Sequence, residues 1–132
     1  MCSSDLTFYA QTGIITLEAT GAAISNGAVS CALLAVNNIR DIEGDTKAGK
    51  LTLAVRIGDT RARRFYMLLI FIAIFSGFIV TILASLSVVL AIPLLSQIRY
   101  LKERDLIQTL GATGRFQLLL GALISIGAII NL

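Results

Sequence analysis

Two aspartates one helical turn apart are the residues of this chain whose types and spacing best fit a chemical role. Asp41 and Asp45 are four positions apart, so a helix places both side chains on one face. Two like charges at that spacing destabilise a helix by about 0.2–0.5 kcal/mol unless a cation lies between them. Carboxylate oxygens suit Mg²⁺, which binds through one or two carboxylates together with substrate phosphates. The pair therefore indicates a site for Mg²⁺ and a diphosphate.

Amide and basic side chains flank this pair on both sides. Asn37 and Asn38 lie one turn before the aspartates and offer amide oxygens as supporting metal ligands. Lys47, Lys50 and Arg56 follow shortly after, and cations of this kind hold phosphate oxygens. The sequence therefore predicts that metal ligands and diphosphate contacts share one polar stretch.

Other charged residues of the stretch fall on a different sector of the same helix. At about 100° per residue, Arg40, Glu43 and Lys47 cluster there. Arg40 is a further candidate contact for the diphosphate. Mixed-sign residues at helical spacing also form ordinary solvated faces. Residue types alone therefore leave a metal site and a solvated face open as alternatives.

The chain around this stretch is too apolar for a soluble domain. Of its 132 residues, 56% are hydrophobic and 14% are charged, whereas soluble domains have about 25% charged residues. The mean hydropathy is +0.85. We therefore expect an all-α fold, a multi-pass transmembrane helical bundle that forms a single domain over residues 1–132.

Uncharged runs predict where the chain crosses the membrane. The run over residues 19–36 is rich in Gly, Ala and Ser, which let helices approach closely in lipid. The run over residues 65–98 would measure about 50 Å as one helix, against a hydrocarbon core of about 30 Å. We therefore expect a turn near residues 84–87.

A second polar loop is expected after that run. Over residues 99–115 the charges return, and Gly111 and Gly114 are expected to break any helix. A final short span follows the loop. The four predicted passes cover residues 19–36, 65–83, 86–98 and 116–131.

The basic residues indicate the orientation of the bundle. All eleven Lys and Arg residues lie in two windows, over residues 40–64 and 99–115. An even number of passes between the windows brings both to one face, which the positive-inside rule places in the cytoplasm. We therefore expect a protein of the inner or plasma membrane whose aspartate stretch faces the cytoplasm. Charge segregated in this way is a topology signal and indicates no nucleic-acid site.

The remaining composition excludes several kinds of catalysis. The chain has no His, which excludes Ser-His and Cys-His catalytic pairs and His-ligated metal sites. Cys2 and Cys31 match no disulfide framework and no metal-ligand spacing. Nothing in the sequence indicates a hydrolase.

The polar stretch resembles a known motif. Residues 37–58 read Asn-Asn-Ile-Arg-Asp-Ile-Glu-Gly-Asp-Thr-Lys-Ala-Gly-Lys-Leu-Thr-Leu-Ala-Val-Arg-Ile-Gly. The paired Asn, the Arg-Asp-x-x-x-Asp, the Gly-Lys-x-Thr-Leu and the Val-Arg-x-Gly resemble, in register, the second aspartate-rich motif of the 1,4-dihydroxy-2-naphthoate polyprenyltransferases. These enzymes belong to the UbiA superfamily of intramembrane prenyltransferases. Residues 9–13 and 110–121 also resemble the C-terminal half of that family.

The resemblance implies a Mg²⁺-dependent transferase of menaquinone biosynthesis. It would join a polyprenyl diphosphate to 1,4-dihydroxy-2-naphthoate and release a demethylmenaquinone, diphosphate and carbon dioxide. Asp41 and Asp45 would be the metal ligands on which catalysis depends, supported by Asn37 or Asn38. The implied diphosphate contacts are Lys47, Lys50, Arg56 and Arg40.

The chain departs from the family in one large respect. The first family motif, of the form Asn-Asp-x-x-x-Asp, is absent from the sequence, together with the helices around it. Half of a two-sided metal clamp cannot close on a diphosphate, so we expect the chain alone to be inactive. It is then a fragment of a longer enzyme, or it needs a partner that supplies the N-terminal half. The alternative is a small non-catalytic membrane subunit whose polar loop binds lipid headgroups or a partner.

Overall fold

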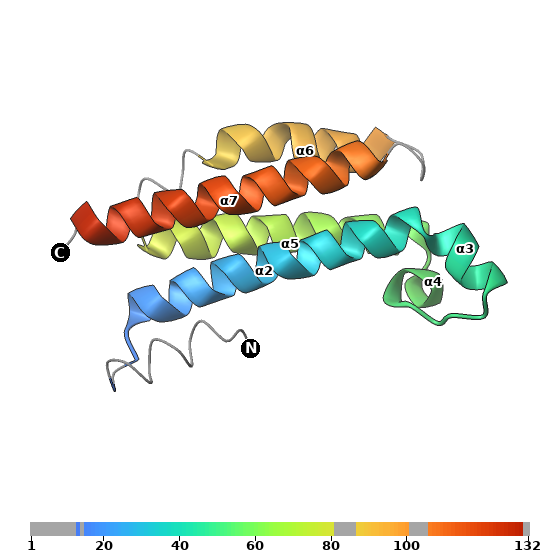
Figure 1. The fold of residues 1–132 in the computed structure, drawn as a ribbon, viewed down its shortest axis with the longest axis horizontal. Coiled ribbons are helices and arrows are strands. Elements are labelled where there is room, and N and C mark those ends of the chain that lie inside the picture. The colour runs from blue at the N-terminus through green and yellow to red at the C-terminus, as the bar shows by residue number, and fades with distance from the viewer. Residues whose placement is uncertain (1–12, 14, 81–86, 101–105, 131–132) are drawn as a thin grey trace.

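Four long helices lie side by side, and two short helices cap one end of them (Figure 1). The computed structural model describes residue 13 and residues 15–80, 87–100 and 106–130, and within these ranges there is no strand. The helices are α2 (Leu17–Arg40), α3 (Ile42–Lys47), α4 (Leu53–Ile57), α5 (Asp59–Val80), α6 (Val88–Tyr100) and α7 (Leu106–Ile130). The predicted all-α fold is confirmed.

The helix α2 begins at a side-chain cap and packs closely on α5. The hydroxyl oxygen of Thr16 accepts a hydrogen bond from the backbone N–H of Ala19 at 3.1 Å, which satisfies one free donor of the first turn. Further along, Ser25 Oγ donates to the carbonyl oxygen of Ala73 on α5 at 2.8 Å. Small side chains permit this approach. The packing expected from the Gly, Ala and Ser content of residues 19–36 is therefore confirmed.

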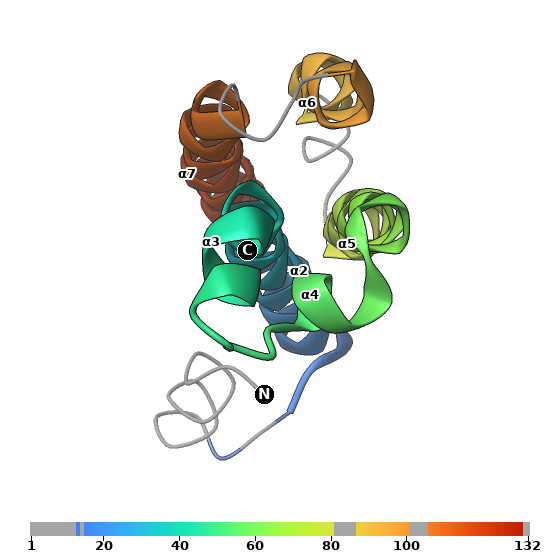
Figure 2. The same cartoon turned by 90° about the vertical axis from the view of Figure 1, so that its right-hand side faces the viewer.

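The core is built from all four long helices, which Figure 2 shows end-on. Each helix buries large apolar side chains toward the others, as the spacing of these residues along each helix allows. The buried residues include Val29, Val36 and Ile39 on α2, Tyr66 and Ile70 on α5, Leu94 and Ile98 on α6, and Phe116 and Leu120 on α7.

The outer surface of the bundle is apolar as well. α2 and residues Leu106–Gly127 of α7 are long and apolar enough to cross a membrane. On α5, Leu68, Phe71 and Phe75 are exposed at helical spacing. A continuous exposed apolar stripe is typical of a surface that contacts lipid or another protein.

The start of α7 differs from the sequence-based expectation. Residues 106–115 were expected to belong to a polar loop, but α7 is helical from Leu106 and continues through Gly111 and Gly114. Thr109, Thr113 and Phe116 follow one another at helical spacing and are buried. Their packing offsets the cost of a helical glycine, which is about 1 kcal/mol.

The other bounds extend or shift the predicted passes. α2 continues to Arg40, four residues beyond residues 19–36, and α5 begins at Asp59, six residues before the run at residue 65. Helical structure therefore reaches into both sides of the polar stretch. Residues 84–86 of the expected turn lie outside the described residues.

Candidate functional site

Asp41 lies at the joint between two helices. It ends α2 and precedes α3, with φ −97° and ψ 8°, and its backbone N–H donates to the carbonyl oxygen of Asn37 at 3.2 Å. The N–H of Asp45 in turn donates to the carbonyl oxygen of Asp41 at 2.8 Å. This hydrogen bond carries the helical register across the joint. The two aspartates therefore lie one turn apart, as the sequence predicts.

Arg40 binds the carboxylate of its neighbour Asp41 through two hydrogen bonds. Nε donates to Oδ1 at 2.8 Å and Nη2 donates to Oδ2 at 2.7 Å. These bonds hold the pKa of Asp41 below its ordinary value of 3.8; burial opposes the effect, and the charges of Arg40 and Lys50 add to it. On an ideal helix Arg40 and Asp41 point to different sectors. The long side chain of Arg40 nevertheless reaches the adjacent carboxylate at the helix end.

Lys50 is brought back beside α3 by the way this helix ends. Its N–H donates to the carbonyl oxygen of Asp45 at 2.8 Å, and the N–H of Gly49 donates to that of Thr46 at 3.2 Å. Gly49 has φ +69°, the left-handed conformation that glycine adopts without strain. Together these bonds form a Schellman motif. The motif turns the chain back at the end of α3, and the charge of Lys50 makes the smallest contribution to the lowered pKa of Asp41.

The remaining predicted site residues lie around the same joint. Asn37 and Asn38 are half-buried in the last turn of α2, while Lys47 ends α3 and Arg56 lies in α4, both exposed. Within the described residues, neither Lys47 nor Arg56 forms an ion pair with either aspartate. The structure thus pairs Arg40 with Asp41 and leaves Lys47, Lys50 and Arg56 exposed.

Thr52 is a residue of this region that sequence reasoning did not single out as a candidate. Its hydroxyl oxygen is buried and has no hydrogen-bond partner within the described residues, although Thr52 precedes α4 at a position where a side chain often caps the helix. Buried hydroxyl groups are usually paired, so an unpaired one is a candidate contact for a water molecule or an ion. Its presence in the Gly-Lys-x-Thr-Leu motif was the available signal.

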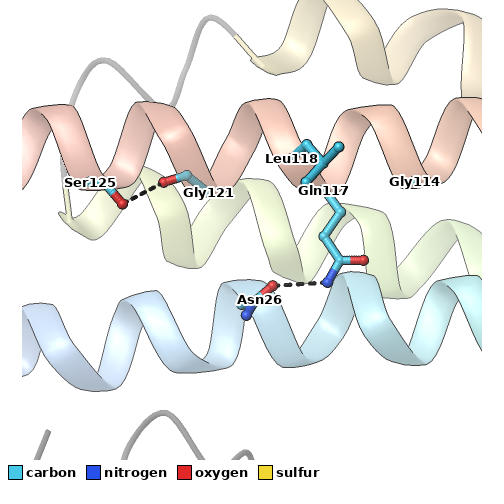
Figure 3. Close-up of a pocket in the computed structure, with 6 residues that line it drawn as sticks. All are labelled: Asn26, Gly114, Gln117, Leu118, Gly121 and Ser125. Carbon is cyan, nitrogen blue, oxygen red and sulfur yellow. Dashed lines mark hydrogen bonds between the residues drawn. The ribbon is translucent and has the colours of Figure 1, made fainter.

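A groove of about 560 Å³ lies between α2 and α7 (Figure 3). It is lined by Asn26, Gly114, Gln117, Leu118, Gly121 and Ser125. Gln117 Nε2 donates to Asn26 Oδ1 and to Ser30 Oγ, both at 3.1 Å, so polar side chains join the two helices. At 100° per residue, Asn26, Ser30 and Asn37 lie within about 40° on α2. The groove is therefore on the motif face of α2, about 22 Å from Asp41 at 1.5 Å per residue.

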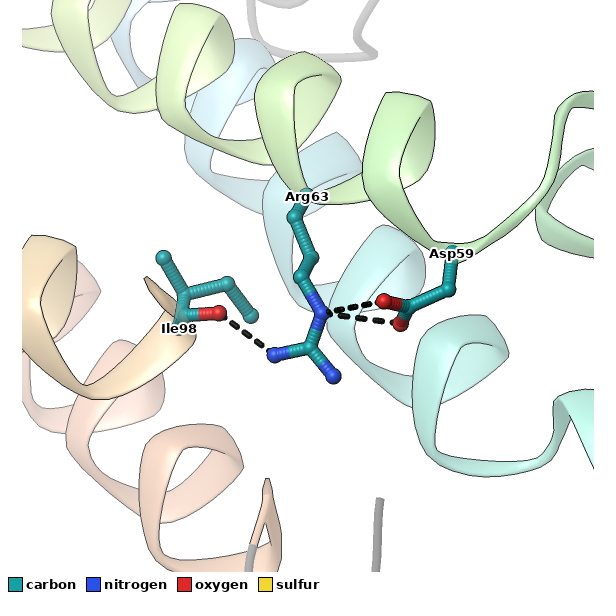
Figure 4. Close-up of polar contacts among 3 residues, drawn as sticks. All are labelled: Asp59, Arg63 and Ile98. Atoms are coloured by element: carbon teal, nitrogen blue, oxygen red, sulfur yellow. Dashed lines mark hydrogen bonds and ion pairs between the residues drawn. The ribbon is translucent and has the colours of Figure 1, made fainter. Parts of the chain in front are cut away.

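Arg63 joins the start of α5 to the end of α6 (Figure 4). Its Nε lies 2.8 Å from both carboxylate oxygens of Asp59, and its Nη1 donates to the carbonyl oxygen of Ile98 at 2.5 Å. The first two turns of α5 therefore lie beside the last turn of α6, as expected for passes that return the basic residues to one face. The i, i+4 spacing of Asp59 and Arg63 was visible in the sequence. The carbonyl partner 35 residues away was not.

The oxygen donors of this region fit a metal ion that is shared with a ligand. Within the described part of the chain, no group of three or more His, Cys, Asp or Glu side chains is placed to hold a metal ion. Two carboxylates one turn apart, with amide oxygens nearby, instead match Mg²⁺ held jointly by protein and phosphate oxygens. The residues therefore fit one side of such a site.

Comparison with known proteins gives the family. The model of the UbiA prenyltransferase family matches residues 5–127. The chain belongs to the UbiA prenyltransferase family. This family is integral to membranes and generally depends on divalent metal ions, which agrees with the apolar helices and with the paired aspartates.

Several relatives within the UbiA family share a name. A 1,4-dihydroxy-2-naphthoate octaprenyltransferase of Haemophilus influenzae is 34% identical over 95% of this chain and 44% of its own length. Proteins of the same name from Escherichia coli and Mycobacterium tuberculosis are 40% and 51% identical, over 60% and 39% of this chain and 28% and 18% of their own lengths. The chain thus spans less than half the length of these curated relatives. No solved structure gave a significant match.

Proposed function

We propose that this chain supplies one side of the active site of a Mg²⁺-dependent polyprenyltransferase of menaquinone biosynthesis. The substrates would be a polyprenyl diphosphate and 1,4-dihydroxy-2-naphthoate. The observation that carries the proposal is the one-turn register of Asp41 and Asp45 in a chain of the UbiA family. Relatives named for octaprenyl transfer to this acceptor support the choice of substrates.

Some residues of the motif would bind the metal ion, and others would bind the phosphate oxygens. Asp41 and Asp45 would hold the metal ion, supported by the amide oxygens of Asn37 or Asn38. Bound Mg²⁺ would offset the charge of the diphosphate as it leaves. The phosphate oxygens would be held by Lys47, Lys50, Arg56 and Arg40.

The reaction itself exchanges one bond for another. The C–O bond between the allylic carbon and the diphosphate breaks, and the ring carbon that bears the carboxylate forms the new C–C bond. The carboxyl group then leaves as carbon dioxide, which yields a demethylmenaquinol. Oxidation of this diol in air gives the demethylmenaquinone that an assay detects. The cationic side chains of the motif would stabilise the negative charge that develops on the departing diphosphate.

Further ligands are needed to close the site. Two carboxylates bind only one side of a metal-diphosphate complex, so we propose that a segment outside these 132 residues supplies the other aspartate-rich motif and that the chain alone is inactive. The clustering of basic residues around the motif in the sequence supports a position in the inner or plasma membrane with the motif in the cytoplasm.

The test is a split-enzyme assay. The chain is produced together with the N-terminal half of the Haemophilus influenzae relative in cells that lack their own enzyme, and Mg²⁺-dependent formation of demethylmenaquinone is measured in membranes. Asp41→Ala and Asp45→Ala should lower activity more than about 100-fold, beyond the 10–100-fold typical of residues that only support a metal ligand. Glu43→Ala, an exposed carboxylate between them, is the matched control and should retain activity.

Two results would contradict the proposal. Equal activity in the two aspartate variants and the control would refute the site. Absence of product from the wild-type chain with its added half would refute the contribution of this chain to an active site.

A non-catalytic headgroup-binding subunit is the second candidate. It is favoured by two exposed cations, Lys47 and Arg56, and by two exposed leucines close to them in the sequence. Leu51 is 75% exposed and Leu53 is 47% exposed. A basic, apolar surface of this kind binds anionic membrane interfaces. This function predicts retention on phosphatidylglycerol vesicles that depends on Lys47, Lys50 and Arg56, needs no Mg²⁺ and is unchanged by Asp45→Ala.

A further inference from the structure

The pairing of Arg40 with Asp41 occupies a carboxylate that the proposed function assigns to a metal ion. Both oxygens of Asp41 accept from the guanidinium, at 2.8 and 2.7 Å. A guanidinium binds carboxylate and phosphate in the same two-pronged geometry. Arg40 is therefore suited to either partner.

The surroundings of the pair allow it to open. The exposed fractions of the two side chains are 29% for Arg40 and 41% for Asp41. An ion pair at such exposure contributes about 0.2–1 kcal/mol at most sites, so thermal exchange with another cation costs little. The backbone at the end of α2 is held independently by the fully buried Ile39 and by the bond from Asp41 N–H to Asn37.

Arg40 also reduces the repulsion between the two aspartates. Carboxylates one turn apart repel each other, and the guanidinium of Arg40 neutralises the charge of Asp41. A divalent cation that takes an oxygen of Asp41 supplies the same compensation and competes with Arg40 for it. Once displaced, Arg40 remains next to the site with its charge unpaired.

We propose that Arg40 is an exchanging cation: it pairs with Asp41 before metal and diphosphate arrive, and it moves to a phosphate oxygen when a divalent cation takes Asp41. The inference rests on the proposed function and adds a rule for how its two ligands bind. Metal alone must displace Arg40, whereas metal with diphosphate gives Arg40 a new partner. The two ligands therefore bind with positive coupling, which by reciprocity each exerts on the other.

The test measures binding, without catalysis. Binding of Mn²⁺ to the purified chain in detergent is followed by the electron paramagnetic resonance signal of free Mn²⁺, with and without inorganic diphosphate. In the wild-type chain, diphosphate should tighten Mn²⁺ binding about 5–150-fold. In Arg40→Gln, Mn²⁺ alone should bind about two- to fivefold more tightly, since the competing pair is gone, and the gain from diphosphate should shrink.

Two variants separate exchange from simple charge removal. Arg40→Lys keeps the charge and loses the two-pronged pair, so it too should bind Mn²⁺ alone more tightly than wild type. Lys50→Gln removes one nearby charge and leaves the pair intact, so its effect on Mn²⁺ alone should be smaller than that of Arg40→Gln. Helical circular dichroism should be the same in all variants.

The outcomes distinguish this inference from the function on which it rests. Arg40 acts by charge alone if Arg40→Lys binds Mn²⁺ as tightly as wild type does and Arg40→Gln and Lys50→Gln have equal effects. That result refutes the exchange but leaves the metal site in place. If Asp41→Ala and Asp45→Ala leave wild-type Mn²⁺ binding unchanged, the metal site is wrong and the exchange falls with it.

Discussion

The hydroxyl group of Tyr66 on α5 lies 2.7 Å from Oγ1 of Thr113 on α7, in the core of the bundle. Thr113 donates its own proton to the carbonyl oxygen of Thr109 at 2.7 Å, so Tyr66 is the donor and Thr113 the acceptor between the two helices. Tyr66 and Thr113 are both fully buried. One hydrogen bond shielded from water therefore joins α5 to α7.

Removal of the acceptor should cost more stability than removal of the donor. Thr113→Val leaves the tyrosine hydroxyl buried without a partner, which costs about 1–3 kcal/mol. Tyr66→Phe leaves no buried polar group without a partner, because Thr113 still donates to Thr109. It should cost about 0.6 kcal/mol, the average for hydrogen bonds between membrane helices. Unfolding of the purified chain in mixed micelles measures both, and equal costs would contradict the assigned donor.

Gly21 lies at a close approach of α2 to α5. A Cβ atom at this position would lie 2.9 Å from Cγ2 of Val80 and 3.2 Å from the carbonyl oxygen of Ser76. Gly21→Ala should therefore push the helices apart and lower the free energy of unfolding by about 1–3 kcal/mol.

The control for this substitution is a glycine in open space. At Gly111 on α7, an added Cβ meets no atom within 4 Å, so Gly111→Ala should be neutral or stabilise by up to about 1 kcal/mol through helix propensity. The same unfolding experiment compares them. A Gly21→Ala chain as stable as the Gly111→Ala chain would show that α2 and α5 are not in close contact there.

Much of this arrangement follows from local features of the sequence. The small residues of α2 predict its close packing, and the four-residue spacing of Asp41 and Asp45 predicts their register, because both depend on helix geometry alone. The start of α7 is different. Gly111 indicates a break when propensity is weighed alone, but burial of Thr109 and Thr113 outweighs that propensity, and burial depends on where the other helices lie.

Choices of side-chain partner were the part that the sequence did not specify. Arg40 had several acidic residues within reach, and its pairing with Asp41 depends on the non-helical backbone at the end of α2. Gln117 finds Asn26 91 residues earlier in the chain, a pairing that follows from how α2 and α7 pack. The partners of long flexible side chains at helix ends and between helices depend on tertiary structure, which the periodicity of the sequence does not encode.

The contact from Arg63 to α6 predicts a specific loss of stability. Arg63 is 15% exposed and binds both Asp59 and the carbonyl oxygen of Ile98. Arg63→Met keeps most of the apolar stem and removes the donors, which should cost about 1.5–3 kcal/mol, the range for hydrogen bonds to charged groups. Arg61→Met, two residues earlier on α5 and exposed, is the matched control and should change stability by less than about 0.5 kcal/mol. A cost for Arg63→Met no larger than that of the control would show that the contact with Ile98 does not stabilise the bundle.

Arg40 should also control the acid titration of Asp41. Two hydrogen bonds from the guanidinium hold the pKa of Asp41 below 3.8. A carboxyl group whose pKa is lowered on folding adds stability above its unfolded pKa, and this contribution is lost as the pH falls through the folded pKa. The pair is therefore expected to stay intact from neutral pH down to about pH 4 and to break below it.

Carbon-13 NMR of labelled aspartate follows this titration directly. The midpoint for Asp41 should lie below 3.8 in the wild-type chain and should rise toward that value in Arg40→Gln, because the dominant cause of the lowered pKa is removed. Arg61→Gln removes an equal charge away from the pair and should leave the midpoint unchanged. A wild-type midpoint at or above 3.8 would mean that Arg40 does not hold this carboxylate in solution, and the metal would then meet no competitor there.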